Sequence, residues 1–262
     1  MKRIATIYAV NLNDWREGAG ADMQRLLAFL PDEARSRAAR HRSERDAERV
    51  IVSDALKRVA ACLEKGLRFR NVEFARDGYG KPFLAGVPDY YFNVSHAKDW
   101  VVCAVGAGGP IGIDVEHIGR AEEEAAELCF TPRELTEWRR QPAERRDAFF
   151  FELWTLKESY SKAVGKGLSI GLSKLETVRH PSGIRIVHQG RIDPELHLQV
   201  VPFDPDYKLS VCMPLEEQAV VVRRFSPGGL LAALQSCSEA GDSGRGGAFP
   251  MITYGNSHNF GI

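Results

Sequence analysis

The order in which helical and strand patterns follow one another constrains the fold of this chain more than any other feature. A strand pattern at residues 3–12 precedes helical periodicity, short strands follow, and the second half repeats this order up to residue 225. The helical segments are 21–42, 44–64, 121–130, 132–140 and 144–164. This pattern predicts an α+β fold of two similar halves, residues 1–116 and 117–225, each with helices packed on a small antiparallel sheet.

The composition changes at residue 226. Residues 226–262 are rich in glycine and serine and contain one apolar run of helical size, Leu230–Leu234. Such a composition is typical of flexible segments. We therefore expect residues 226–262 to form a flexible tail outside the two halves.

Charge and cysteine usage exclude several classes of protein. The 35 basic and 35 acidic residues balance, so no overall field attracts nucleic acid or an anionic membrane. The five cysteines are odd in number and form no C-x-x-C pair, which favours reduced thiols over disulfides or a zinc site. No window reaches the roughly 20 apolar residues that span a bilayer, and the N-terminus lacks a cleavage-site pattern. The sequence predicts a soluble, cytoplasmic protein that binds neither nucleic acid nor membranes.

The stretch IGIDVE, which ends at Glu116, has the pattern of a strand with two different faces. Because side chains alternate along a strand, Ile111, Ile113 and Val115 share one face, as a core requires. The opposite face carries the carboxylates of Asp114 and Glu116. The pair is either two solvated acids or the beginning of a site for a cation.

The helix predicted over residues 144–164 has a polar stripe. Trp154, Glu158 and Lys162 lie four residues apart, so they share one face. Taken alone, this spacing is typical of a surface helix whose Glu–Lys pair contributes only ~0.3–0.5 kcal/mol.

Three further segments each have an ordinary interpretation beside a functional one. FNVSH at 92–96 is a strand end whose Ser95 and His96 could face an anion; neighbours on a strand point to opposite faces, so His96 is poorly placed to activate Ser95. GYGKP at 78–82 is a turn in which the following proline holds Lys81 extended. The arginine-rich segment around Arg37 is a solvated helix face or a local anion site.

The order of these motifs along one chain is distinctive. F-N-x-S-H is followed about 20 residues later by G-I-D-V-E, then by W-x-x-K-E-S-x-x-K and G-K-G-L. This series resembles the 4′-phosphopantetheinyl transferases, in particular their monomeric, two-halved Sfp-type branch. The resemblance extends from about residue 3 to about residue 224. One position departs from it, because Ala97 stands where many relatives have a second serine.

The resemblance implies an enzyme that transfers the 4′-phosphopantetheine arm of coenzyme A to a serine of an apo carrier protein and releases adenosine 3′,5′-bisphosphate. It implies Mg²⁺ held by Asp114, Glu116 and Glu158, since Mg²⁺ prefers carboxylates, waters and phosphate oxygens. Glu158 would also take the serine proton, directly or through a metal-bound water, and the sequence leaves open which role dominates. Lys162 would stabilise charge on the leaving phosphate. Lys157, about 100° further around the helix, is the less favoured lysine.

The resemblance also assigns the contacts with coenzyme A to Arg37, Arg76, Lys81, Ser95, His96 and Lys162. Arg37 would pair with a phosphate, the 3′-phosphate first of all, through its forked donors. Arg76 and Lys81 would hold the nucleotide end. His96 would be a phosphate ligand and not a catalytic base.

The implied partners are apo carrier proteins of nonribosomal peptide, polyketide or fatty-acid synthases, bound by a monomer. Two other functions compete with transfer. One is a module that binds coenzyme A or a carrier protein without chemistry, which a missing metal ligand would favour. The other is a general Mg²⁺ phosphodiesterase, which hydrolysis of coenzyme A without an acceptor would favour.

Overall fold

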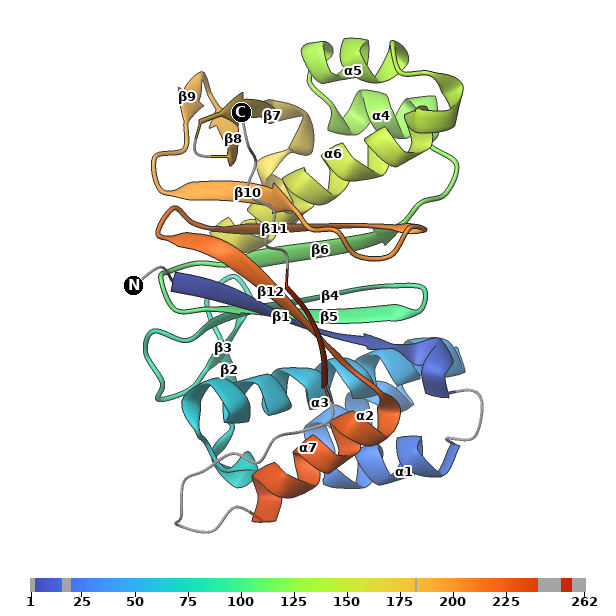
Figure 1. Cartoon of the computed structure of the whole chain (residues 1–262), viewed down its shortest axis with the longest axis vertical. Coiled ribbons are helices and arrows are strands. Elements are labelled where there is room, and N and C mark those ends of the chain that lie inside the picture. The colour runs from blue at the N-terminus through green and yellow to red at the C-terminus, as the bar shows by residue number, and fades with distance from the viewer. Residues whose placement is uncertain (1–2, 16–19, 182, 240–250, 256–262) are drawn as a thin grey trace.

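Two β-sheets lie face to face at the centre of the molecule, with helices outside each of them (Figure 1). The computed structural model describes residues 3–15, 20–181, 183–239 and 251–255. The first sheet has the spatial order β13 (Met251–Gly255), β12 (Glu217–Phe225), β1 (Arg3–Asn11), β5 (Trp100–Gly106) and β4 (Tyr91–Ala97). The second has the order β6 (Gly112–His117), β11 (Tyr207–Pro214), β10 (Leu196–Val200), β8 (Gly183–His188) and β7 (Leu175–His180), with β9 (Arg191–Ile192) beside β8. A hairpin of β2 (Phe74–Arg76) and β3 (Pro82–Leu84) stands apart from both sheets.

Alternation of side chains builds the interface between the sheets. On β1, Ile7 faces the second sheet, whereas its neighbour Tyr8 packs against the helices on the outer face. On β6, Ile113 and Val115 join Ile111 in the core between the sheets, where all three are fully buried. The predicted core face of IGIDVE is confirmed. The other face of β6 is therefore turned toward the helices of the second half.

The helices of the first half are α1 (Gly20–Phe29), α2 (Asp32–Ala39) and α3 (Glu44–Lys65). The single helical segment expected over residues 21–42 is divided, because Pro31 stands in extended conformation before α2 and a proline interrupts the hydrogen bonds of a helix interior. Ser43 caps α3, and Gly66 ends it in the left-handed conformation.

The helices of the second half are α4 (Glu123–Cys129), α5 (Pro132–Arg139) and α6 (Ala143–Val164). Thr131 and Glu134 cap α5, each side chain bonded to the other's backbone N–H. Gly165, with φ of 74°, ends α6. Among the described residues, none of the helices is long and apolar enough to cross a membrane.

The chain crosses between the sheets twice, so the division between the two sheets does not coincide with the boundary between the halves expected at residues 116 and 117. β6 pairs with β11 and so belongs to the second sheet. β12 returns to the first sheet, where it lies parallel to β1, although an antiparallel sheet was expected. Local patterns cannot reveal such pairings, since the partner of a strand is set by long-range packing.

The prediction of a flexible tail is wrong for residues 227–239. These residues form α7 (Pro227–Glu239), which packs against α1 and α3 and buries Leu230, Leu231 and Leu234. The short apolar run is enough to hold a helix in place because it packs against an apolar face of α3. β13 then pairs with β12, and the remainder of the expected tail lies outside the described residues.

Candidate active site

Gly112 allows α6 to lie directly on β6. A Cβ atom at Gly112 would stand 2.0 Å from the carbonyl oxygen of Ser159 and 2.5 Å from the amide nitrogen of Ala163. Any larger residue would push the helix away from the strand. The glycine beside the two carboxylates therefore brings α6 within reach of them.

The close contact between strand and helix gathers most of the predicted residues around one cavity. Asp114 and Glu116 come from β6, and Glu158 and Lys162 come from the stripe of α6. The cavity has a volume of about 350 Å³. Its wall consists of Val94, Ser95, His96, Asp114, Glu116, Trp154, Glu158 and Lys162.

A network of short hydrogen bonds fixes one oxygen of Asp114. Lys162 Nζ donates to Asp114 Oδ1 at 2.6 Å and to Ser95 Oγ at 3.0 Å. Ser95 Oγ donates to the same carboxylate oxygen at 3.0 Å and accepts from the Val115 amide at 3.4 Å. A hydroxyl has one proton and two lone pairs, so these three contacts use the whole capacity of Ser95.

Burial raises the pKa of each carboxylate in the cavity, and the charge of Asp114 adds to this effect at the other two. Burial, together with the charges of Asp114 and Glu158, raises the pKa of Glu116 to about 7. Burial and Asp114 also raise the pKa of Glu158, and burial raises that of Asp114 despite the adjacent ammonium of Lys162. Three acids thus share one lysine, an arrangement that favours binding of a further cation.

The same residues fit a hard divalent ion. Asp114 Oδ2 and Glu158 Oε1 are buried without a hydrogen-bond partner, although buried polar atoms normally have one. Across the described ranges, no group of three or more histidine, cysteine, aspartate or glutamate side chains is placed to hold a metal ion by itself. An ion that takes one or two carboxylates and fills its other positions with water and substrate phosphates, as Mg²⁺ does, matches this donor set.

Lys157, next to Glu158 in sequence, points away from the cavity. Its ammonium is fully buried and lies 2.5 Å from Glu134. It also donates to the carbonyl oxygens of Cys129 at 2.8 Å and Leu172 at 3.2 Å. This lysine therefore joins α6 to the α4–α5 pair, a role that the sequence motif alone does not reveal.

His96 lies at the exposed rim of the cavity. Partial burial, with the cations Arg49 and Lys162 nearby, lowers the pKa of its imidazole. At neutral pH the ring is therefore a neutral hydrogen-bonding group facing the cavity.

The structure does not bring Arg37, Arg76 and Lys81 into this cavity. Arg37 donates to Glu33 and Asp54, both at 2.8 Å, and shares the wall of a small separate cavity with Arg76. Lys81 Nζ donates to the carbonyl oxygens of Lys162 at 2.8 Å and Ala163 at 3.0 Å. Lys81 thus caps the C-terminal end of α6 from the first half of the chain.

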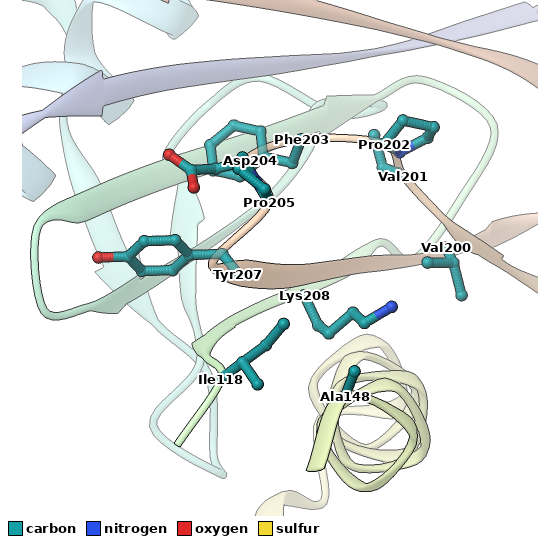
Figure 2. A pocket seen from close by; sticks show the side chains of 10 residues that line it. All are labelled: Ile118, Ala148, Val200, Val201, Pro202, Phe203, Asp204, Pro205, Tyr207 and Lys208. Carbon is teal, nitrogen blue, oxygen red and sulfur yellow. The ribbon is translucent and has the colours of Figure 1, made fainter. Parts of the chain in front are cut away.

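A second large cavity, of about 420 Å³, lies between α6, β11 and residues 200–205 (Figure 2). Lys208 lies between β11 and α6 beside Ala148 (Figure 2), and its ammonium is 3.0 Å from Glu152. Asp204, the acidic side chain in this wall, accepts a hydrogen bond from Trp100 at 3.1 Å. The groups suited to metal and acid–base chemistry are therefore in the smaller cavity.

Comparisons with known proteins identify the family of this chain. Residues 110–212 match the model of the 4′-phosphopantetheinyl transferase superfamily, and residues 13–107 match the 4′-phosphopantetheinyl transferase, N-terminal model. A 4′-phosphopantetheinyl transferase of Bacillus subtilis is 32% identical over 213 residues, which cover 79% of this chain and 91% of that relative. The chain therefore belongs to the 4′-phosphopantetheinyl transferase superfamily.

Within that superfamily the chain is an enzyme of the Sfp type. It is 34% identical to 4′-phosphopantetheinyl transferase psf-1 of Bacillus pumilus, over 79% of this chain and 88% of the relative. It is 31% identical to 4′-phosphopantetheinyl transferase Sfp of Bacillus subtilis strain 168, over 72% and 84%. A holo-(acyl-carrier-protein) synthase of Bacillus anthracis, solved with coenzyme A, aligns with 39% of this chain and 92% of its own at 22% identity and a TM-score of 0.34.

Proposed function

We propose that the enzyme transfers the 4′-phosphopantetheine arm of coenzyme A to a serine of an apo carrier protein in a Mg²⁺-dependent reaction, and that it does so as a monomer. Adenosine 3′,5′-bisphosphate is the other product. The observation that carries this proposal is the convergence of Asp114, Glu116, Glu158 and Lys162 on one cavity. A binding module without chemistry would not need three acids in one cavity, two of which have a pKa raised by burial and by the charge of Asp114.

Mg²⁺ would be held by Asp114, Glu116 and Glu158. The unpartnered oxygens of Asp114 and Glu158 support this assignment. When bound, the ion supplies positive charge to the diphosphate of coenzyme A, which a neutral hydroxyl must otherwise approach against two negative charges.

Glu158 is the proposed base for the serine hydroxyl. Its Oε1 is buried without a partner in the cavity wall, and burial raises its pKa, which makes the carboxylate a stronger base. Lys162 is positioned by Asp114 at 2.6 Å, and its ammonium would stabilise the charge that develops on the leaving phosphate.

The proposed contacts with coenzyme A divide between two places. Ser95, His96 and Lys162 line the cavity at the reacting end. The hydroxyl of Ser95 already makes its full set of hydrogen bonds, so its proposed effect on coenzyme A is to hold Asp114 and Lys162 in place. Arg37 and Arg76 share a second wall with Lys57 and Arg58, in which four cations accompany the acids Glu33 and Asp54. That excess of positive charge supports a role in holding the nucleotide phosphates. Lys81, the third residue proposed for the nucleotide end, bonds carbonyl oxygens at the end of α6 and would have to leave them to reach the nucleotide.

Intact-protein mass spectrometry of apo carrier proteins tests the proposal. Peptidyl, polyketide and fatty-acid carriers are incubated separately with the enzyme, coenzyme A and Mg²⁺. We expect a gain of one phosphopantetheine, lost on chelation of Mg²⁺ and reduced about 100- to 1,000-fold in Glu158→Gln. Glu152→Gln, the same change on the same helix but beside Lys208, is the matched control and should keep its activity.

Hydrolysis of coenzyme A at the same rate without any carrier would contradict transfer and favour a phosphodiesterase. Full transfer by Glu158→Gln would remove the assignment of base and metal ligand. The carrier that reacts fastest identifies the class of synthase that the enzyme serves.

A further inference from the structure

β4 and β6 meet at the junction of the two halves without forming a common sheet. β4 is the edge strand of the first sheet and β6 is the edge strand of the second. The outer edge of β6 therefore presents backbone N–H groups that β11 does not bond. Buried N–H groups need an acceptor from elsewhere.

Side chains of β4 supply those acceptors. Asn93 Oδ1 accepts a hydrogen bond from the Ile113 amide at 3.1 Å, and Ser95 Oγ accepts one from the Val115 amide at 3.4 Å. Alternate residues of one strand thus bond alternate residues of the other, which is the spacing that the period of two requires. We call this pair of contacts the edge clamp.

The edge clamp encloses the residue on which the site depends. Asp114 lies between Ile113 and Val115, so both flanking amides are fixed to β4. Its Oδ1 is held by Ser95 and Lys162, which leaves Oδ2 unpartnered. Ser95 bonds Asp114 and Lys162 as well as the Val115 amide, so a change there would disturb both the strand and the carboxylate network. Asn93 bonds the backbone of β6 and neither of these two side chains.

We infer that Asn93 is a positioning residue for phosphopantetheinyl transfer. Its carboxamide fixes β6 against β4 and so orients Asp114 and Glu116 toward Glu158 and Lys162. The inference rests on the proposed function, because the positions of Asp114 and Glu116 affect catalysis only if the enzyme transfers phosphopantetheine at this cavity. The contact with Ile113 also explains why an asparagine precedes Ser95 by two residues: the two side chains must lie on the same face of β4.

Asn93→Leu removes the acceptor while keeping the size of the side chain, and Asn93→Asp restores an acceptor oxygen. We expect Asn93→Leu to lower kcat about 10- to 100-fold, the range found when a supporting contact of a metal site is lost. The KM for coenzyme A should change less than kcat, because the side chain supports the carboxylates and is not a ligand. Asn93→Asp should recover most of kcat.

Two readouts do not depend on turnover. Hydrogen exchange of the peptide covering residues 111–117 should become faster in Asn93→Leu, and binding of Mn²⁺, measured by electron paramagnetic resonance, should weaken by a similar factor to kcat. Tyr8→Phe is the matched control, since it removes the partly buried hydrogen bond to Glu64 at 2.6 Å on the opposite side of the first sheet. It should leave exchange of β6 and kcat unchanged.

Unchanged exchange and kcat in Asn93→Leu would overturn the inference, and so would a change confined to the KM for coenzyme A. Asn93→Ala, which adds no apolar bulk, takes the place of the leucine variant if that variant does not fold. If the unaltered enzyme modified no carrier, the proposed function would fail, whereas the exchange and Mn²⁺ measurements would still decide whether Asn93 holds the carboxylates.

Discussion

Lys157 and Lys162 lie five residues apart on α6, and each is paired with a buried acid, but their surroundings differ. The ammonium of Lys157 is fully buried, 2.5 Å from Glu134, which is itself 2% exposed as a side chain. The ammonium of Lys162 is 2.6 Å from Asp114, and its side chain keeps 27% of its surface exposed to the cavity. The Lys157–Glu134 pair has every partner inside the protein, and we call it the sealed pair. The Lys162–Asp114 pair faces a space that a ligand can enter, and we call it the open pair.

The difference shows how one helix can carry structure on one side and chemistry on the other. Glu134 also accepts hydrogen bonds from the Thr131 and Thr177 amides, both at 2.9 Å, so the sealed pair satisfies the N-terminal cap of α5 and an amide within β7. Asp114 keeps an oxygen without a partner. A buried ion pair with complete hydrogen bonding fixes structure, while an incomplete one remains available for binding.

Breaking the sealed pair should have the largest effect on stability. Lys157→Met leaves the carboxylate of Glu134 buried and without its cation, which costs about 3–5 kcal/mol of unfolding free energy. Burial lowers the pKa of Lys157 despite the charge of Glu134, which shows how little water reaches the pair. Water therefore cannot solvate the Glu134 carboxylate once the ammonium is removed. Urea unfolding measures the loss. Unchanged stability together with lost transfer would reverse the roles assigned to the two lysines.

Opening the other pair should affect transfer more than folding. Lys162→Met removes the cation of the cavity, and we expect transfer to fall about 100- to 1,000-fold, or ~2.7–4 kcal/mol of transition-state stabilisation. Unfolding free energy should fall less than in Lys157→Met, because water and ions can reach Asp114 through the cavity. Rates from intact mass and unfolding curves of both variants, measured side by side, test this order. Equal losses of stability would contradict it.

The sequence predicted the residues of the open pair without predicting that they pair, and it missed the sealed pair, for physical reasons. The period of a strand places Asp114 and Glu116 on one face and the period of a helix places Glu158 and Lys162 on one face, while only the resemblance to the 4′-phosphopantetheinyl transferases joined the two sets into one site. The partner of Lys157 is a capping residue on another helix, and no periodicity connects the two. Burial of α7 on α3 and the return of β12 to β1 also rest on long-range packing. Arg37 looked free for a ligand because its ion pair with Asp54, 17 positions away, is equally non-local.

The cavity of the open pair should also make the stability of the protein depend on pH, in a way that the sealed pair does not. Because the pKa of Glu116 is raised from 4.5 to about 7, the folded protein keeps a proton that the unfolded chain loses between these values. Stability of the metal-free protein should therefore fall as the pH rises through this window. Glu116→Gln should reduce this fall, leaving the part due to Glu158 and Asp114, and raise unfolding free energy at pH 8 by about 1–2 kcal/mol, a shift discounted for partial exposure. Melting curves at pH 5 and pH 8 in a chelator measure it; an unchanged pH slope would contradict the assignment.

The smallest expected effect separates charge from hydrogen bonding in the sealed pair. Adding Glu134→Gln to Lys157→Met removes the uncompensated charge, so we expect a recovery of about 1 kcal/mol relative to the single variant. Recovery should be incomplete, because Glu134 Oε2 accepts from Thr131 and Oε1 from Thr177, and an amide has only one acceptor oxygen. Full recovery in the double variant would mean that charge alone holds α6 to α5. No recovery would mean that the hydrogen bonds of Glu134 to the two backbone amides carry the contact, with the lysine serving to fill space.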